Sequence, residues 1–110
     1  MAEDIFHYTD RIGFNGIRST PIWLFKAAQP PCDNPFGAYF TILEPSERQN
    51  LKKLRMPRKK REFCFGFVDV GDLKALRGDR GAYVFYSASD YVVTEGRQRY
   101  SGRRVDWKPS

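Results

Sequence analysis

The sequence is poor in metal-binding side chains and in long apolar segments. Its 110 residues include one histidine and two cysteines, Cys32 and Cys64. One imidazole and two distant thiols do not provide the four ligands of a zinc site, and two cysteines do not make a disulfide framework. No apolar run approaches the roughly 20 residues that span a membrane. We therefore expect neither a bound metal nor a membrane-spanning segment.

The composition is that of an aromatic-rich globular chain. Hydrophobic residues make up 41% of it, charged residues 29% and aromatic residues 15%. These fractions are typical of a folded protein rather than a disordered one, and the length suits one hydrophobic core. We expect residues 1–110 to form a single domain. Cys64 lies in an apolar run, so we expect a buried thiol there.

The net charge of +6 is concentrated in two segments. Residues 52–61 hold seven of the 19 basic residues, and residues 96–110 hold five more. Basic segments attract phosphate-bearing partners, whether a nucleotide, a nucleic acid or a membrane surface. A solvated helix end followed by a loop explains residues 52–61 equally well. Residues 96–110 are expected to be a partly mobile tail unless Trp107 docks on the domain.

Apolar patterning predicts an α+β domain of short elements. Strands are expected over residues 4–9, 22–25, 36–42, 62–70, 82–86 and 91–94, and helices over 11–17, 45–56 and 73–77. The strand at 62–70 is apolar on both faces and should be central. Thr9 or Asp10 can cap the first helix, in which Gly13 and Gly16 lie on one face and allow close packing.

Three short motifs carry the polar side chains that point to a function. They are His7-Tyr8-Thr9, Gly37-Ala38-Tyr39-Phe40-Thr41 and Asp90-Tyr91-Val92-Val93. Each has an ordinary structural explanation when taken singly. In this order and spacing they resemble the ADP-ribosyltransferases of the diphtheria-toxin-like group, whose triad is a histidine, a tyrosine and an acid. The opening His7-Tyr8-Thr9-Asp10, followed by Gly13 and Gly16, is most similar to a toxin-associated subgroup with a His-Tyr-Asp signature.

The resemblance implies a fold, a ligand and a role for each motif residue. The fold is a split, bent mixed β-sheet with two or three short helices, and NAD+ binds as co-substrate in the cleft between its halves. His7 would bond the ribose hydroxyls, and the main chain of Tyr8 would hold the nicotinamide carboxamide with the Thr9 hydroxyl nearby. Tyr39 would stack on the nicotinamide ring. Asp90 would bond the 2′-hydroxyl of the nicotinamide ribose.

The implied activity is mono-ADP-ribosyl transfer to an acceptor that the sequence does not identify. Nicotinamide leaves NAD+ as a neutral molecule, so no general acid is needed, unlike glycoside hydrolysis with its two carboxylates. A carboxylate held against the 2′-hydroxyl stabilises the positive charge that develops on the sugar, a contribution of about 3–4 kcal/mol. Asp90, His7 and Tyr39 are therefore the expected catalytic residues.

The sequence departs from the family pattern at three places. Asn50 and Leu51 stand where larger members offer a second aromatic ring to nicotinamide, and Phe36 is a candidate replacement. The acid is Asp90 rather than a glutamate. Ala88 stands two residues earlier, where toxins that modify arginine often carry a glutamate, so an arginine acceptor is not expected.

Two alternatives stay open beside the transferase. One is an NAD glycohydrolase, in which water is the acceptor. The other is a non-catalytic module of the same fold that binds nucleic acid or a protein through residues 52–61 and 96–110. Glu3, Asp4 and His7 interrupt any secretory signal at the N-terminus. We expect a cytoplasmic protein, one delivered into a target cell if it is a toxin, or a nuclear one if residues 52–61 act as an import signal.

Overall fold

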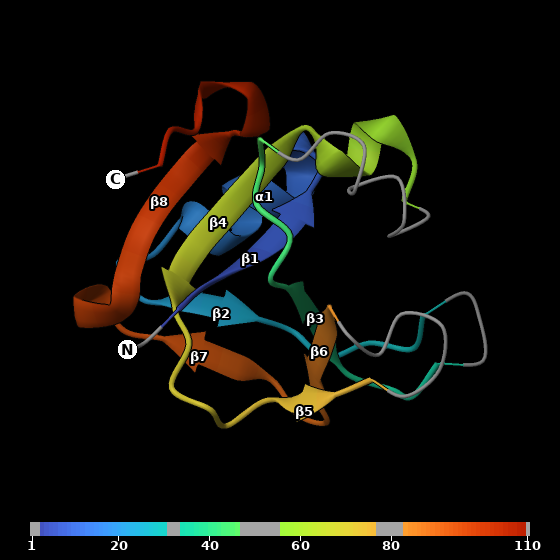
Figure 1. Ribbon diagram of the computed structural model, residues 1–110. Coiled ribbons are helices and arrows are strands. Elements are labelled where there is room, and N and C mark those ends of the chain that lie inside the picture. The colour runs from blue at the N-terminus through green and yellow to red at the C-terminus, as the bar shows by residue number, and fades with distance from the viewer. Residues whose placement is uncertain (1–2, 31–33, 47–55, 77–82, 110) are drawn as a thin grey trace.

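Two antiparallel sheets and one α-helix make up the described part of the chain (Figure 1). The computed structural model describes residues 3–30, 34–46, 56–76 and 83–109. Its strands are β1 (Asp4–Thr9), β2 (Trp23–Phe25), β3 (Ala38–Thr41), β4 (Phe63–Val68), β5 (Lys74–Ala75), β6 (Val84–Ser87), β7 (Tyr91–Val93) and β8 (Gln98–Arg103). The helix is α1 (Arg11–Arg18), and the 3-10 turns are η2 (Arg58–Arg61), η3 (Glu95–Arg97) and η4 (Arg104–Asp106). The predicted α+β class is confirmed.

The larger sheet has the strand order β5-β6-β3-β1-β4-β8, and β2 pairs with β7 in the smaller one. Every pair formed by these described strands is antiparallel, so the expectation of a mixed sheet is wrong. Antiparallel neighbours need only short connections, which suits a chain of this length. Within the described ranges, no helix has the length and apolar content to cross a lipid bilayer.

The larger sheet is joined unevenly along its width. β1 and β4 are paired at six register positions and β3 and β6 at four, whereas β1 and β3 are paired only at Phe6 and Thr41. Figure 1 shows the result as two groups, with β8, β4 and β1 running together and β3, β6 and β5 turned away from them. The seam between β1 and β3 is the narrowest connection in this sheet.

Aromatic side chains fill both faces of this sheet. One core cluster packs β2, β7 and α1 against it and contains Phe14, Trp23, Phe25, Phe40, Phe63, Phe65, Phe67 and Tyr91. The opposite face carries a second cluster that includes Phe6, Tyr8, Cys64 and Val84. β4 therefore contributes to both clusters, as predicted for a central strand. Cys64 is a fully buried free thiol, which confirms the expected buried cysteine, and its burial raises the pKa of the thiol to about 12.

The described part of the basic C-terminal segment contains a strand of the larger sheet. Residues Gln98–Arg103 form β8 and pair with β4, from Phe63 opposite Arg103 to Phe67 opposite Gln98. Beyond η4, Trp107 places its ring edge-on to Phe6, with 5.7 Å between the centroids. The sequence predicts a partly mobile tail unless Trp107 docks on the domain, and this docking is what the structure shows. The pairing of β8 was not predicted; it supplies partners to main-chain groups at the open edge of β4.

The predicted helix over residues 73–77 is also wrong, since Lys74 and Ala75 form β5 and pair with Tyr86 and Phe85 of β6. A two-residue strand has too little apolar pattern to be distinguished from a helical turn, and pairing with β6 decides its conformation. The predicted helix over 45–56 falls largely on residues 47–55, which lie outside the described residues.

Helix α1 begins as predicted, because the Asp10 carboxylate accepts a hydrogen bond from the Gly13 N–H at 2.9 Å. The helix packs so closely on β1 that a Cβ atom added to Gly13 would lie 2.1 Å from the Thr9 hydroxyl oxygen. Gly16, on the next turn, has nothing within 4 Å of the same position. Only the first of the two glycines is required for close packing.

We predict that Gly13→Ala destabilises the protein by about 1–3 kcal/mol, since overpacking outweighs the gain of about 1 kcal/mol in helix propensity. Gly16→Ala is the matched control and should be neutral or stabilising, because it gains the same propensity without a clash. Urea unfolding of the two variants checks both values. Equal stability of the two variants would contradict the packing of α1 on Thr9.

Candidate functional site

His7 lies on β1 where β1 and β3 separate. Its Nδ1 atom is 2.9 Å from the main-chain oxygen of Tyr39, one residue beyond the single register pair of the two strands. A carbonyl oxygen only accepts hydrogen bonds, so Nδ1 carries the proton. In that tautomer of the neutral ring, Nε2 is the acceptor nitrogen. A side chain thus ties the first predicted motif to the second.

The surroundings of His7 favour the neutral imidazole. The ring is half-buried and packs on Phe25 and Phe40, with centroid separations of 4.8 and 5.6 Å. Burial lowers the pKa of His7 below its ordinary value of 6.5, and the bond to the Tyr39 carbonyl only partly offsets this effect. At neutral pH the ring therefore presents a hydrogen-bond acceptor rather than a positive charge.

Asp90 lies directly before β7 and is exposed. Its Oδ1 atom accepts a hydrogen bond of 2.8 Å from the main-chain N–H of Ala27, which follows β2. The pairing of β2 with β7 explains this contact, because Phe25 lies opposite Tyr91 and the next residues of each strand run on side by side. The carboxylate is therefore held by a fixed main-chain donor at the surface.

All three predicted motifs contact one short segment, residues 25–28. Phe25 packs on the His7 ring, Ala27 donates to Asp90, and Ala28 pairs with Gly37 through two main-chain hydrogen bonds of 3.0 Å. Three residue steps of extended chain cover about 10 Å. The motifs are separated widely in sequence, yet they meet along this segment.

The Tyr39 side chain takes a different direction from that of His7. Its ring stacks on Tyr86 at 5.7 Å and packs against the second core cluster, whereas the His7 ring packs on Phe25 and Phe40 of the first. Side chains alternate between the faces of a sheet, which places these two rings on opposite faces. The main-chain oxygen of Tyr39, not its phenol, reaches the imidazole. The Tyr39 hydroxyl donates to the Pro35 carbonyl.

The two remaining motif residues are largely covered by protein. The Tyr8 side chain is buried in the second cluster, and its hydroxyl donates to the Leu43 carbonyl at 2.7 Å. The Thr9 side chain lies beneath Gly13 of α1 and is buried. The hydroxyl of Thr9 therefore contacts α1, and its predicted proximity to a nicotinamide carboxamide remains a prediction.

The contribution of residues 25–28 is not predictable from the sequence. The Ala27 N–H that holds Asp90 is a main-chain group, and an alanine carries no chemical signal for such a role. Phe25 was expected as a strand residue, yet its contact with the His7 ring depends on the packing of β2 across the larger sheet. Short-range patterns in the sequence therefore predict neither of these two contacts.

Comparison with known proteins gives no match: no family model, curated protein or solved structure is significantly similar to this chain. Its function is therefore inferred from its own residues.

We predict that the single imidazole of the protein titrates with a midpoint below 6.5, because burial disfavours its charged form. The unfolded chain then takes up the proton more readily than the folded one. Stability conferred by neutral His7 should be complete above pH 6.5 and decline as the pH falls toward the native midpoint. An NMR titration of the histidine ring protons gives the midpoint directly, and a value at or above 6.5 would contradict the packing described for this ring.

Proposed function

We propose that the chain is an NAD+-dependent mono-ADP-ribosyltransferase. The observation that carries the proposal is the contact of His7, Gly37 and Asp90 with the same segment, residues 25–28. These three residues come from the three motifs that resemble the diphtheria-toxin-like enzymes. The seam between β1 and β3 supports the finer proposal that the larger sheet is the split, bent sheet of that family.

His7 is proposed to bind a ribose hydroxyl of NAD+ through Nε2. The Tyr39 carbonyl holds the proton on Nδ1, and burial keeps the ring neutral. A neutral imidazole in this tautomer accepts a hydrogen bond from a hydroxyl donor. The packing of the ring on Phe25 and Phe40 restricts its orientation, which is what a sugar-positioning group requires.

Asp90 is proposed to act as the electrostatic residue of the reaction. The bond between nicotinamide and C1′ of the ribose breaks, its electron pair leaves with neutral nicotinamide, and the acceptor forms a new bond to C1′ as it loses a proton. Positive charge on the sugar is largest in the transition state, where a carboxylate at the 2′-hydroxyl stabilises it. The hydrogen bond from Ala27 to one carboxylate oxygen fixes the position of the group.

Tyr39 is proposed to serve the site first through its carbonyl, which orients His7. The predicted stacking of its ring on nicotinamide would require a ligand that also reaches the face on which Tyr39 packs against Tyr86. Phe36 is half exposed at 51% and lies just before β3, so it is the alternative aromatic partner. The main chain of Tyr8 remains the proposed partner of the carboxamide.

We predict that purified protein releases nicotinamide from NAD+ and that Asp90→Asn lowers the rate about 100- to 1000-fold, the loss expected for one electrostatic group. His7→Ala should also lower the rate, while Glu95→Gln, an isosteric change at another exposed acid, should leave it unchanged. Chromatographic measurement of free nicotinamide checks all three. Equal rates in Asp90→Asn and wild type would overturn the assignment of the acid.

The fate of the ADP-ribose separates the transferase from the alternatives. A mass increase on a protein or nucleic acid incubated with NAD+ identifies a transferase, and free ADP-ribose with no modified acceptor identifies a glycohydrolase. A non-catalytic module would release no nicotinamide at all. Urea unfolding of each variant keeps a loss of activity distinct from a loss of structure, which matters most for His7 because of its buried contacts.

A further inference from the structure

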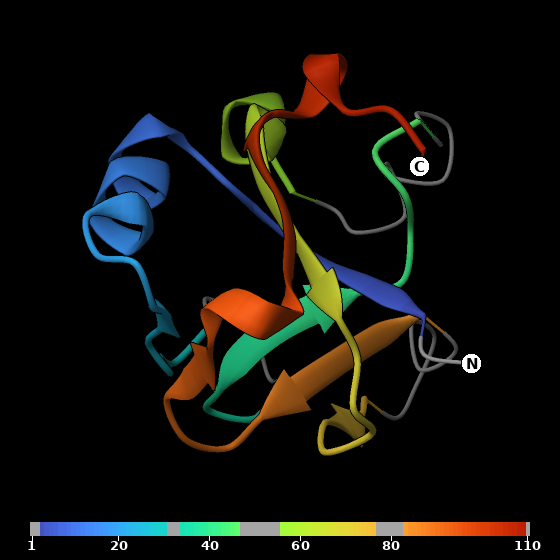
Figure 2. The same ribbon diagram turned by 90° about the vertical axis from the view of Figure 1, so that its left-hand side faces the viewer.

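Basic residues from three distant segments meet at one end of the molecule. They are Arg11 at the start of α1, Arg58–Arg61 in η2, and Arg103 with Arg104 at the end of β8. Figures 1 and 2 show η2, the start of α1 and the end of β8 at the same end of the ribbon, uppermost in both views. We call these seven residues the basic end. The last two segments belong to the basic runs that are visible in the sequence, whereas Arg11 lies outside them.

Strand register brings the segments together. Thr9, Phe63 and Arg103 lie opposite one another on the neighbouring strands β1, β4 and β8. Arg11 follows Thr9 closely, and its guanidinium lies 5.9 Å from the centroid of the Phe63 ring. The arrangement of cations is therefore set by main-chain pairing and is not a chance meeting of long side chains.

Hydrogen bonds fix the end of β8 to the residues around η2. The Arg104 N–H donates to the Glu62 carbonyl at 2.9 Å, and the Arg104 Nε donates to the Arg61 carbonyl at 3.1 Å. Arg104 thus supports the surface, and Arg61 is likewise half-buried. Arg11, Arg58, Lys59, Lys60 and Arg103 are exposed and face solvent.

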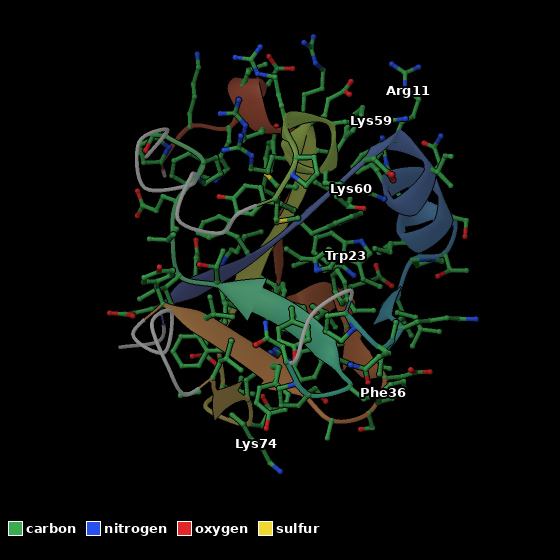
Figure 3. The ribbon with its side chains drawn as sticks, turned by 90° about the vertical axis from the view of Figure 1, so that its right-hand side faces the viewer. Arg11, Trp23, Phe36, Lys59, Lys60 and Lys74 are labelled. Carbon is green, nitrogen blue, oxygen red and sulfur yellow. The ribbon has the colours of Figure 1, made fainter. Side chains whose placement is uncertain are left out.

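Acidic residues only partly neutralise the basic end. Asp10 forms an ion pair with Lys60 at 2.8 Å, and Glu62 and Asp106 are the other acids within these stretches of chain. Seven basic and three acidic side chains over residues 10–11, 58–62 and 103–106 carry a net charge of +4. In Figure 3, Arg11, Lys59 and Lys60 lie in the upper part of the molecule, and Lys74 lies at the lower end.

We propose that the basic end binds the sugar-phosphate backbone of a nucleic acid. The row of paired residues Thr9, Phe63 and Arg103, which runs from β1 across β4 to β8, crosses two strand spacings, or about 10 Å. One nucleic-acid strand rises about 3.4 Å along a duplex axis for each phosphate, so a surface of this length can contact more than one phosphate. A single small anion would use only part of such a surface. Arginine predominates among these residues, and its planar fork matches the phosphate oxygens.

The apolar surroundings favour nucleic acid over an anionic membrane. Among the described residues, the exposed large apolar side chains next to the basic end are Ile12 and Val105, at 81% and 52% exposure. Trp107 turns inward and packs on Phe6. Interfacial binding needs a broad apolar face that enters the lipid, which two isolated side chains do not form. None of the described aromatic residues beside the basic end is exposed enough to stack on a base. Contact would then be confined to the backbone, and little sequence preference is expected.

The test measures binding of fluorescein-labelled single-stranded and duplex DNA by anisotropy over a range of salt concentrations. We expect log Kd to depend steeply on log salt, with each lost phosphate contact lowering the slope by about 0.7 to 0.9. Arg58→Ala combined with Lys59→Ala should lower affinity at least about tenfold and reduce the slope by about 1.5. Both side chains are exposed, so urea unfolding of this variant should be unchanged.

Lys74→Ala combined with Arg99→Ala is the matched control, because it removes the same two residue types and the same charge. Arg99 lies four residues before Arg103 on β8, about 13 Å away in extended chain. The control should lower affinity less than about threefold and keep the salt slope. Equal losses in the two double variants would overturn the proposal, since binding would then follow net charge alone.

Vesicles of phosphatidylcholine with phosphatidylserine provide the competing ligand. Sedimentation with these vesicles and no binding to either DNA would assign the basic end to a membrane and overturn the proposal, as would binding to neither. The proposal stands apart from the NAD+ chemistry: DNA binding needs no nicotinamide release, and nicotinamide release needs no DNA. Failure of one measurement therefore leaves the other interpretable.

Discussion

The register of β1 against β4 is the constraint on which the rest of the structure depends. Six paired positions hold the two strands together, and alternate residues of β1 enter opposite core clusters. Ile5 and His7 face β2 and α1, while Phe6 and Tyr8 face the second cluster. A slip of one residue would exchange these faces and place the imidazole among the side chains of the wrong cluster. Burial of Ile5 and Phe6 therefore also decides where His7 points.

On its other side, β1 meets β3 at the seam beside which His7 lies. β3 joins β1 at one register position, and beyond it the His7 side chain bonds the main chain of Tyr39. One hydrogen bond thus sets the tautomer of the imidazole and links two motifs. The smaller sheet adds the third motif, because β2 leads into residues 25–28 while β7 follows Asp90. The candidate site is a product of both sheets.

β1 also relates the candidate site to the basic end. Thr9 lies two residues beyond His7, roughly 7 Å along the strand. Its neighbours Phe63 and Arg103 lead directly to the exposed cations. The surroundings of β1 thus change along its length. Aromatic rings pack around its centre, whereas basic residues of α1 and η2 lie near its end. The two proposed binding surfaces therefore lie at different places along the same strand.

Local patterns were sufficient where a residue's neighbours in sequence decide its structure. The extent of β1, the Asp10 cap of α1 and the burial of β4 on both faces follow from alternation, a short side-chain acceptor and a continuous apolar run. The same reasoning failed for β5 and for β8. β5 pairs with the edge of β6, and β8 pairs with the edge of β4. The residues of β5 and β8 do not themselves indicate that these edges are free to pair.

By itself, the sequence determined the α+β class, the aromatic core, the buried Cys64 and the three motifs, because these depend on residue type and short-range spacing. Tertiary structure alone decided that Phe25, Ala27 and Ala28 meet those motifs, that the rings of His7 and Tyr39 leave the sheet on opposite faces, and that Arg11 joins two distant basic segments. The physical reason is common to all three. Each depends on strand register and on main-chain hydrogen bonds, whose donors and acceptors are nearly the same in every residue.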